Sequence, residues 1–252
     1  MNHHCPVCER EHEATICPDC GFDHSVSYEH YPTLAPVPAD RKAASAMQKR
    51  SAGSGCLKLP DGTYVGEFVN GLPDGRGKMI YTNGDTYEGQ WLHGLRHGQG
   101  SATWAVGSVY TGQWVNGECH GQGVMTYDTG NSYNGQWSNG KHHGHGRADW
   151  IMGDIYEGQW MNGLAHGQGT RTYANGNIYE GQWLLDARHG TGKMRYANGN
   201  VYEGQWFQDE HIGFGKMVYA NGNLYEGQWE HSQPHGQGKM TFADGSVYEG
   251  IF

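Results

Sequence analysis

Apolar and polar residues alternate along most of this chain with a period of two, inside a longer period of 23 residues. In segment 156–160, tyrosine, glycine and tryptophan share one face of an extended strand, while glutamate and glutamine share the other. Segment 193–196 alternates in the same way and leads to Asn198-Gly199, a pair typical of tight turns because both residues tolerate positive φ. Each 23-residue unit is therefore predicted to form a β-hairpin, with adjacent units paired into one antiparallel ribbon.

The 23-residue period runs from Tyr64 to Phe252 without a slip. Glycine follows each tyrosine after two residues, and a large aromatic residue, usually tryptophan, follows after four. A second aromatic row lies seventeen residues after each tyrosine, from Tyr81 to Phe242. Eight hairpins at about 4.8 Å per strand predict a rod roughly 80 Å long, stabilised by contacts between neighbours. The repeating tyrosines are Tyr64, Tyr87, Tyr110, Tyr133, Tyr156, Tyr179, Tyr202, Tyr225 and Tyr248.

Two units depart from the pattern in a turn. Where most other units have Asn-Gly six and seven residues after the tyrosine, these units have Leu185-Asp186 and Gln208-Asp209. The sequence therefore predicts that this edge of the rod departs from a uniform surface around these two units.

The composition follows from the repeat. Of 252 residues, 42 are glycine, 9 tryptophan, 16 tyrosine and 6 phenylalanine, while only 36% are hydrophobic. These numbers disfavour a mixed helix-and-sheet enzyme with an aliphatic core, and the many aromatic residues argue against disorder. A net charge of −9 disfavours nucleic-acid binding through a general basic surface. No stretch approaches the length of a transmembrane helix and the N-terminus lacks a signal-peptide pattern, so a cytoplasmic protein is expected.

Residues 1–24 carry four cysteines in two Cys-x-x-Cys pairs separated by eight residues. Each pair can form a tight turn around a metal ion, and two such turns supply four thiolates in a tetrahedron. The segment resembles a short zinc ribbon, which implies one structural zinc ion because four cysteines leave no open coordination position. Two disulfide bonds or a redox-active pair are alternative interpretations. The predicted zinc ligands are Cys5, Cys8, Cys17 and Cys20.

Residues 25–55 are predicted to be a linker, and residues 56–252 to be the repeat domain. The linker contains three prolines and ends in the glycine- and serine-rich segment Ser51–Gly55. Between them, Ala39–Arg50 is predicted to form about three helical turns with Asp40 as the N-cap. This helix carries four basic residues in an acidic protein, so it is either a solvated linker or a segment that docks on the repeats or on a partner.

Segment 156–169, Tyr-Glu-Gly-Gln-Trp-Met-Asn-Gly-Leu-Ala-His-Gly-Gln-Gly, closely resembles the MORN repeat (membrane occupation and recognition nexus). Eight complete units and the start of a ninth match this pattern over residues 64–252. The resemblance implies an all-β fold, an elongated single-layer antiparallel rod of β-hairpins. It also implies a groove that takes a helix or an extended peptide, or self-association of two rods. Catalytic members of the family carry separate kinase or methyltransferase domains, and this sequence contains neither.

No arrangement of residues outside the repeat suggests catalysis. The recurring glutamates follow the period, and no helix follows the Gly-x-Gly pairs as a phosphate-binding loop requires. We therefore expect a non-enzymatic scaffold that binds a protein partner, or a second copy of itself, through rings that are mostly internal but expose their edges. The residues predicted to contact the partner are Tyr87, Trp91, Tyr110, Trp114, Tyr133, Trp137, Tyr156, Trp160, Tyr179, Trp183, Tyr202 and Trp206.

Two other functions stay open. The first is membrane lipid binding, the activity in the family's name. It is disfavoured because residues 64–252 contain 11 basic and 18 acidic residues, a net charge of −7. The second is carbohydrate binding by an aromatic solenoid, although such modules are usually exported.

Histidines recur ten residues after most of the tyrosines. They are expected to lie in turns and to form hydrogen bonds with the backbone. Because histidine titrates near pH 6.5, we hypothesise that partner binding changes below about pH 6.

Overall fold

The computed structural model describes residues 3–4, 11–12 and 51–252 of the chain. The chain divides into two units, residues 1–49 and residues 50–252. In the first unit, β1 (His3–His4) pairs antiparallel with β2 (Glu11–His12), with His3 opposite His12. The four N-terminal cysteines and the helix predicted for Ala39–Arg50 lie outside the described residues, so the zinc ribbon and the linker helix stay predictions.

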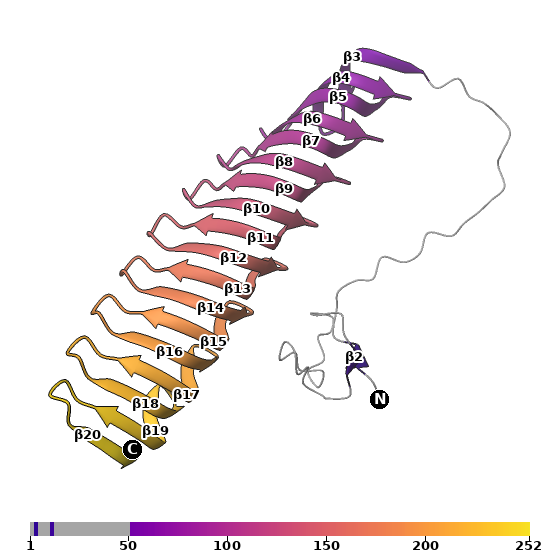
Figure 1. Ribbon diagram of the computed structural model, residues 1–252. Helices are drawn as coiled ribbons and strands as arrows, with labels where there is room; N and C mark the ends of the chain where they lie inside the picture. Colours follow the sequence, from indigo (N-terminus) through magenta and orange to yellow (C-terminus); the bar gives the residue numbers. More distant parts are fainter. Residues whose placement is uncertain (1–2, 5–10, 13–50) are drawn as a thin grey trace. The chain divides into compact units, whose positions relative to one another are not determined.

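The second unit is one open antiparallel sheet of 18 strands, each paired with the next along the chain. Figure 1 shows the hairpins stacked in chain order along one axis, from β3 to β20. The predicted all-β rod of hairpins is confirmed. The strands are β3 (Ala52–Leu59), β4 (Gly62–Val69), β5 (Leu72–Tyr81), β6 (Thr86–Leu92), β7 (Leu95–Thr103), β8 (Val109–Val115), β9 (Glu118–Thr126), β10 (Ser132–Ser138), β11 (Lys141–Asp149), β12 (Ile155–Met161), β13 (Leu164–Thr172), β14 (Ile178–Leu184), β15 (Ala187–Arg195), β16 (Val201–Phe207), β17 (Glu210–Val218), β18 (Leu224–Glu230), β19 (Gln233–Thr241) and β20 (Val247–Ile251).

The sheet begins at Ala52, inside the segment assigned to the linker, rather than at residue 56. From here on, units are numbered 1 to 8 by their tyrosines, so that unit 1 begins at Tyr64 and unit 5 at Tyr156. Each unit consists of an even-numbered strand that carries the tyrosine and the odd-numbered strand that follows it. Among the described residues, no helix is long and apolar enough to cross a membrane.

Two kinds of turn connect the strands. Within a unit the turn has two residues with positive φ, such as Asn162 (53°) and Gly163 (93°), which suits the twist of a hairpin. The departures in units 6 and 7 keep this geometry, because Leu185 and Asp186 have φ values of 51° and 68°. The edge therefore continues through these units without a break in the backbone.

A longer loop connects one unit to the next. Asn198-Gly199 lies in the turn of the hairpin formed by β15 and β16, as predicted, but only Gly199 has a positive φ. The turn is closed by hydrogen bonds from the Gly199 N–H to the Tyr196 carbonyl oxygen and from the Tyr196 N–H to the Asn200 carbonyl oxygen, both at 2.9 Å. Asn200 also links the loop to the next unit, since its Oδ1 accepts the N–H of Ala220 at 2.9 Å.

Each hairpin contains a β-bulge at the same place. In unit 5 the strands pair at Gly158 and Gly169, and the register shifts before Trp160 pairs with Ala165. The bulge contains Gly167, with a φ of 60°, and the following N–H, that of Gln168, donates to the Gln159 side chain at 2.7 Å. A bulge bends its strand and increases the local twist. The glutamine of the repeat therefore stabilises the bend of each hairpin.

The core of this single layer is a continuous row of rings. The Tyr156 ring lies against Gly169, where an added Cβ would sit 2.3 Å from the Tyr156 Oη, so only glycine leaves room for it. The Trp160 Nε1 donates to the Gly146 carbonyl oxygen of the preceding unit at 3.0 Å. Tyr156 makes edge contacts with Trp160 and Trp183, with ring centroids 4.9 and 5.3 Å apart. Each unit is thus bonded to both neighbours through its rings and its backbone.

Candidate functional site

The predicted partner-binding rings lie inside the sheet's core. Their exposed fractions range from 0 to 6%, so the exposed ring edges expected from the sequence are not found. The physical reason is that each tyrosine lies flat on paired glycines, and the tryptophans of two units close the space beside it. The rings that the sequence assigned to partner contact, and that the structure buries, are Tyr87, Trp91, Tyr110, Trp114, Tyr133, Trp137, Tyr156, Trp160, Tyr179, Trp183, Tyr202 and Trp206.

A partner that approaches this face meets other side chains first. The residue nine positions after each tyrosine, on the odd-numbered strand, covers that tyrosine, and we call it the cover residue. In unit 4 the His142 ring stacks on Tyr133 with centroids 3.6 Å apart, between Trp137 and Trp160. Unlike the rings beneath, the cover residue changes from unit to unit. The cover residues are Pro73, Arg96, Cys119, His142, Ala165, Arg188, His211 and Pro234.

A row of half-buried aromatic residues lies beside the cover residues, at the start of the loops between units. It is the second aromatic row predicted from the sequence, and its rings pack against the core while remaining partly accessible. Its half-buried members are Tyr81, Trp104, Tyr127, Trp150, Tyr173, Tyr196 and Tyr219. The accessible part of what we call the aromatic face consists of this row and of the partly exposed cover residues Arg96, His142, Arg188 and Pro234. The cover residues Pro73, Cys119, Ala165 and His211 are buried.

The aromatic face contains two hollows. The larger one, about 590 Å³, lies between units 4 and 5, and we call it the Ala165 hollow. Its walls include Trp150, Trp160, Arg171 and Asp186. Arg171 forms an ion pair with Asp154 and lies over the Trp150 ring, with its Cζ 5.2 Å from the ring centroid. The next loop residues, Ile151 and Met152, are apolar and mostly exposed.

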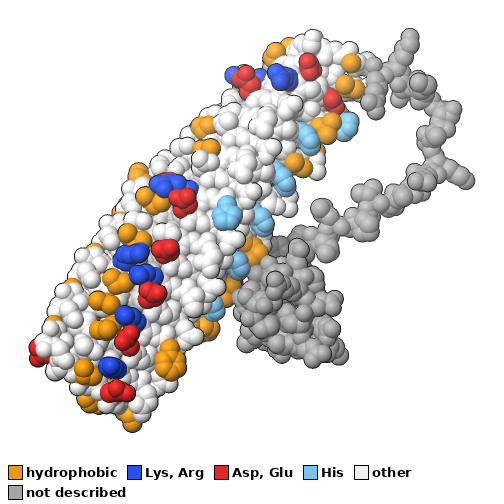
Figure 2. All heavy atoms as spheres, viewed as in Figure 1, with side chains coloured by type: hydrophobic (Ala, Val, Ile, Leu, Met, Phe, Trp, Pro, Cys, Tyr) orange, Lys and Arg blue, Asp and Glu red, His pale blue; other side chains and the backbone are white. Residues whose placement is uncertain are grey.

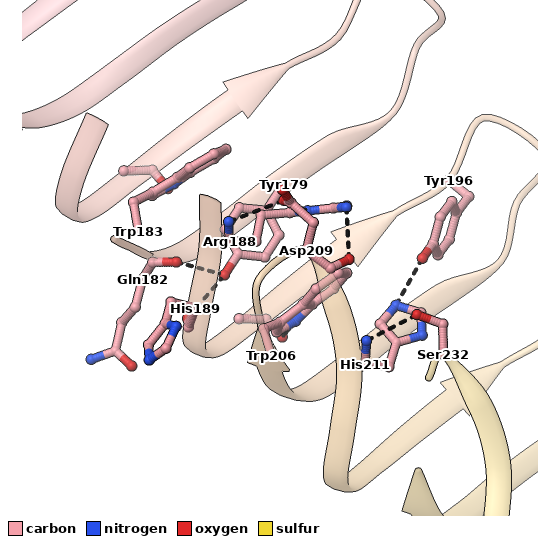
Figure 3. Close-up of polar contacts among 12 residues, drawn as sticks. Tyr179, Gln182, Trp183, Arg188, His189, Tyr196, Trp206, Asp209, His211 and Ser232 are labelled. Carbon is pink, nitrogen blue, oxygen red and sulfur yellow. Dashed lines mark hydrogen bonds and ion pairs between the residues drawn. The ribbon is translucent and has the colours of Figure 1, made fainter. Parts of the chain in front are cut away.

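The second hollow, about 400 Å³, lies between units 6 and 7, and we call it the His211 hollow. Figure 3 shows its polar contacts. The Arg188 Nε donates to the Asp209 Oδ1 at 2.7 Å, and the His211 Nε2 lies 2.9 Å from the Tyr196 Oη. The His211 backbone N–H donates to the Ser232 Oγ at 3.0 Å. The polar groups of this hollow are thus largely engaged with one another.

Burial keeps several histidines and one cysteine of the sheet neutral at pH 7. It lowers the pKa of His142 and of His211 to about 4, and lowers the pKa of His166 and His189 as well. Burial also raises the pKa of Cys119 to about 12, so this thiol is not a reactive thiolate. The hypothesis of a histidine switch near pH 6 therefore does not apply to these groups.

The histidines ten residues after the tyrosines do not all bond to the backbone as expected. Among residues 51–252, no hydrogen-bond partner lies near the buried Nδ1 atoms of His97, His120 and His166. Within the described part of the chain, no group of three or more metal-ligating side chains could hold a metal ion.

The opposite face of the sheet is polar. Ion pairs cross between adjacent units, such as Lys193 with Glu203 at 3.0 Å and Lys216 with Glu226 at 3.4 Å. Figure 2 shows basic and acidic side chains alternating along one side of the view and histidines along the other. Exposed pairs of this kind contribute little to stability, typically about 0–1 kcal/mol each. This face serves as a control surface for experiments on the aromatic face.

The fold defines a solenoid of stacked β-hairpins with an internal aromatic row. The MORN repeat model matches eight consecutive units, at residues 64–86, 87–109, 110–132, 133–155, 156–178, 179–201, 202–224 and 225–247. The chain therefore belongs to the MORN-repeat family. No protein with a curated description matches the sequence significantly.

Several solved structures resemble this chain at a distance. The TCP domain of Drosophila melanogaster SAS-4 (dCPAP), solved in complex with a proline-rich motif of Ana2, is 10% identical with a TM-score of 0.39; the match covers 88% of this chain and 99% of that one. The TCP10 domain of Danio rerio CPAP is 9% identical with a TM-score of 0.43, over 78% of this chain and 93% of that one. Similarities this distant say nothing about what this chain binds.

Sequence reasoning missed the cover residues. The pattern placed the tyrosines and tryptophans on one face correctly, but it did not predict which side chains lie over them. The position was detectable, because it is inward-facing by alternation and yet differs among units, with arginine, histidine, proline, cysteine and alanine all occurring there.

Proposed function

We propose that this protein is a non-enzymatic scaffold whose aromatic face binds a segment of a partner protein. The observation that carries the proposal is the contrast between two layers of this face. The buried rings repeat almost without change, whereas the cover residues differ between units and leave two hollows lined by half-buried aromatic rings. A repeat surface on which the side chains differ from unit to unit, while the backbone stays regular, suits recognition of one extended segment.

The chemistry of the two hollows supports a protein segment as the occupant. They combine tryptophan, tyrosine and arginine side chains, the residue types enriched in the hot spots of protein interfaces, with aspartate carboxylates that can pair with a cationic group. The exposed Ile151 and Met152 beside the Ala165 hollow add apolar area that an occupant would cover. A second copy of this chain is an alternative occupant of the same face.

Two further parts of the proposal rest on sequence alone. One structural zinc ion held by Cys5, Cys8, Cys17 and Cys20 is proposed from the donor set, because four thiolates satisfy tetrahedral zinc. A cytoplasmic location is proposed as the second part.

The test compares two surfaces of the intact protein. Trp150→Ala with Tyr196→Ala removes half-buried rings from the two hollows, while Gln122→Ala with Gln168→Ala changes exposed side chains of the opposite face. Circular dichroism and thermal unfolding establish that both variants fold. Proteins captured from native lysate are then identified by mass spectrometry, and the direct interaction is measured with the purified candidate.

We expect a partner that the intact protein and the opposite-face variant retain and that the aromatic-face variant loses. A partner lost only by the opposite-face variant contradicts the proposal. Flotation of the intact protein with liposomes, with no protein lost by the aromatic-face variant, would replace the scaffold with the membrane alternative.

A further inference from the structure

The cover residue of unit 6 is an arginine held in a defined way. The Arg188 Cζ lies 4.5 Å from the centroid of the Trp206 ring and 5.9 Å from that of Tyr179. Its Nε donates to the Asp209 Oδ1 at 2.7 Å, and its Nη2 donates to the Asp209 carbonyl oxygen at 3.0 Å. Figure 3 shows Arg188 extended beside Trp206 toward Asp209. The guanidinium thus has two aromatic neighbours and a carboxylate.

Unit 2 repeats this arrangement. The Arg96 Cζ lies 4.4 Å from the Trp114 ring centroid and 5.9 Å from that of Tyr87. Its Nη2 donates to the Gly117 carbonyl oxygen at 2.7 Å. A guanidinium over a tryptophan ring is a favourable cation–π contact, stronger where water is excluded. Two units therefore show that the repeat frame can hold an arginine side chain at the cover position.

Unit 5 has the same backbone arrangement and turn aspartate but no arginine at the cover position. Its cover residue is Ala165, and Asp186 occupies the turn position that Asp209 occupies in the next unit. The Asp186 Oδ1 accepts the Ala165 N–H at 2.6 Å, as the Asp209 Oδ1 accepts the Arg188 N–H at 3.1 Å. In both turns, the N–H of the aspartate also donates a hydrogen bond to the carbonyl oxygen of the cover residue. Only the long cationic side chain is missing.

The space and the charge in unit 5 both suit that missing group. Ala165 and Asp186 line the Ala165 hollow of about 590 Å³ together with Tyr156 and Trp160. Arg171, the basic side chain of this hollow, is already neutralised by its ion pair with Asp154. Among the described residues, the Asp186 carboxylate makes no ion pair, whereas Asp209 is paired with Arg188.

Unit 3 offers a contrast inside the same molecule. Its cover residue, Cys119, is also small, but the turn position that corresponds to Asp186 is Gly140. Unit 3 therefore supplies tyrosine and tryptophan rings without a carboxylate. A cation is expected to gain less there, because the ion pair is absent.

We propose that the Ala165 hollow is an anchor site for an arginine side chain of the partner protein, with the guanidinium paired to Asp186 as Arg188 is paired to Asp209. Arginine fits better than lysine because its planar guanidinium can stack on a ring and bond a carboxylate at the same time. This inference rests on the proposed function, since it names the group by which a partner segment attaches to the aromatic face.

The first test uses a defined probe on the intact chain. The peptide acetyl-Gly-Ser-Arg-Ser-Gly-amide is titrated into ¹⁵N-labelled protein while the tryptophan indole resonances are followed by NMR. By analogy with Arg188 over Trp206, the ring that receives the guanidinium is that of Trp183. We expect the indoles of Trp183 and of Trp160, which lines the hollow, to shift at millimolar peptide, and the lysine analogue to bind about fivefold to tenfold more weakly. Equal binding of the two peptides, or no shift with either, overturns the proposal.

In the second test, a side chain of the protein itself occupies the Ala165 hollow. Ala165→Arg reproduces the Arg188 arrangement beside Asp186, so the variant is expected to unfold at the same temperature or higher and to lose binding of the arginine peptide. Cys119→Arg fills the corresponding position of unit 3 and is expected to leave binding unchanged. Undiminished binding by Ala165→Arg overturns the proposal even though the variant folds.

A third variant removes the charge and keeps the turn. In unit 7 the His211 N–H bonds to Ser232 at the position of Asp186, so Asp186→Ser is expected to preserve the backbone hydrogen bond. We expect the variant to fold and to bind the arginine peptide about tenfold more weakly. Unchanged affinity contradicts the assigned role of the carboxylate.

The partner experiment separates the two proposals. If the partner is lost by the Trp150→Ala and Tyr196→Ala variant but retained by Ala165→Arg, the scaffold stands and the arginine anchor falls. If both variants lose the partner, both proposals are supported. If neither variant loses it, the scaffold falls, and the partner anchor that rests on it falls as well.

Discussion

The tyrosine that begins each unit combines packing with a hydrogen bond. The Tyr156 ring lies on the paired glycines, and its Oη donates to the Gln159 carbonyl oxygen at 2.9 Å. The same bond recurs in every unit, for example from Tyr202 to Gln205 at 3.0 Å. A buried hydrogen bond of this kind contributes about 1 kcal/mol, and each aromatic pair adds about 0.5–1.5 kcal/mol. Each tyrosine therefore stabilises its unit through both its ring contacts and its hydrogen bond.

Stability is expected to fall as the pH drops from 7 to 5. The pKa of His142 and of His211 is about 4 in the folded protein, against 6.5 for an ordinary histidine. Between these values the unfolded chain binds more protons, so stability that is present above pH 6.5 is lost as the pH falls toward 4. The loss at pH 5 amounts to about 1–2 kcal/mol per histidine.

Urea unfolding at pH 7 and pH 5 checks this expectation. The variant His142→Ala with His211→Ala, which introduces the cover residue found in unit 5, is expected to lose less stability between the two pH values. His145→Ala, a change of an exposed ring, is the control and is expected to keep the full pH dependence. If the intact protein and the double variant lose equal unfolding free energy between pH 7 and pH 5, His142 and His211 do not cause the pH dependence.

At the scale of the element, the bulge explains why glutamine recurs in every complete unit after the first. The Gln159 Oε1 accepts the N–H that the bulge leaves outside the ladder. Unit 1 has glutamate instead, and the Glu67 Oε2 accepts the Arg76 N–H at 2.9 Å. An acceptor at this position is therefore a requirement of the bent hairpin rather than a feature of a solvated face.

Gln159→Ala is expected to lower the free energy of unfolding by about 1 kcal/mol, because the Gln168 N–H loses its acceptor. Gln159→Glu keeps an acceptor oxygen, as in unit 1, and is expected to change stability by less than about 0.5 kcal/mol. Urea unfolding of both variants provides the measurement. The explanation fails if alanine is tolerated as well as glutamate.

On the scale of the whole molecule, the rod consists of units that contact their neighbours in sequence. Strand contacts run between consecutive strands from β3 to β20, and the ring row follows the same order. Stability in such an architecture is close to a sum of unit and nearest-neighbour terms. A complete unit can therefore be removed without disturbing the register of the others.

Deletion of residues 110–132, one full unit, is expected to give a folded rod with the far-ultraviolet circular dichroism of the intact protein and a somewhat lower unfolding temperature. Deletion of residues 110–121, about half a unit, joins strands out of phase and is expected to prevent a cooperative transition. A full-unit deletion that fails to fold would show coupling beyond nearest neighbours.

Much of the fold was predictable because periodicity reports local geometry. Alternation at 156–160 identified the strand and its buried face, and the 23-residue period identified the hairpin stack and the MORN-repeat family. The Asn198-Gly199 turn was predicted but its backbone geometry was not, because an Asn-Gly pair fits both a two-residue turn and a longer loop, and strand pairing decides between them. Residues 52–55 were taken for linker because glycine and serine carry no alternation, yet they pair with β4.

The sequence by itself determined the all-β repeat, the order of its units and the face on which the rings lie, since these follow from side-chain alternation. Tertiary structure alone decided which parts of that face remain accessible. The bulge bends each hairpin and the rings then bury one another, so the accessible surface consists of the half-buried second aromatic row and of cover residues such as Arg188. That outcome depends on contacts between residues of neighbouring units, which no local pattern encodes.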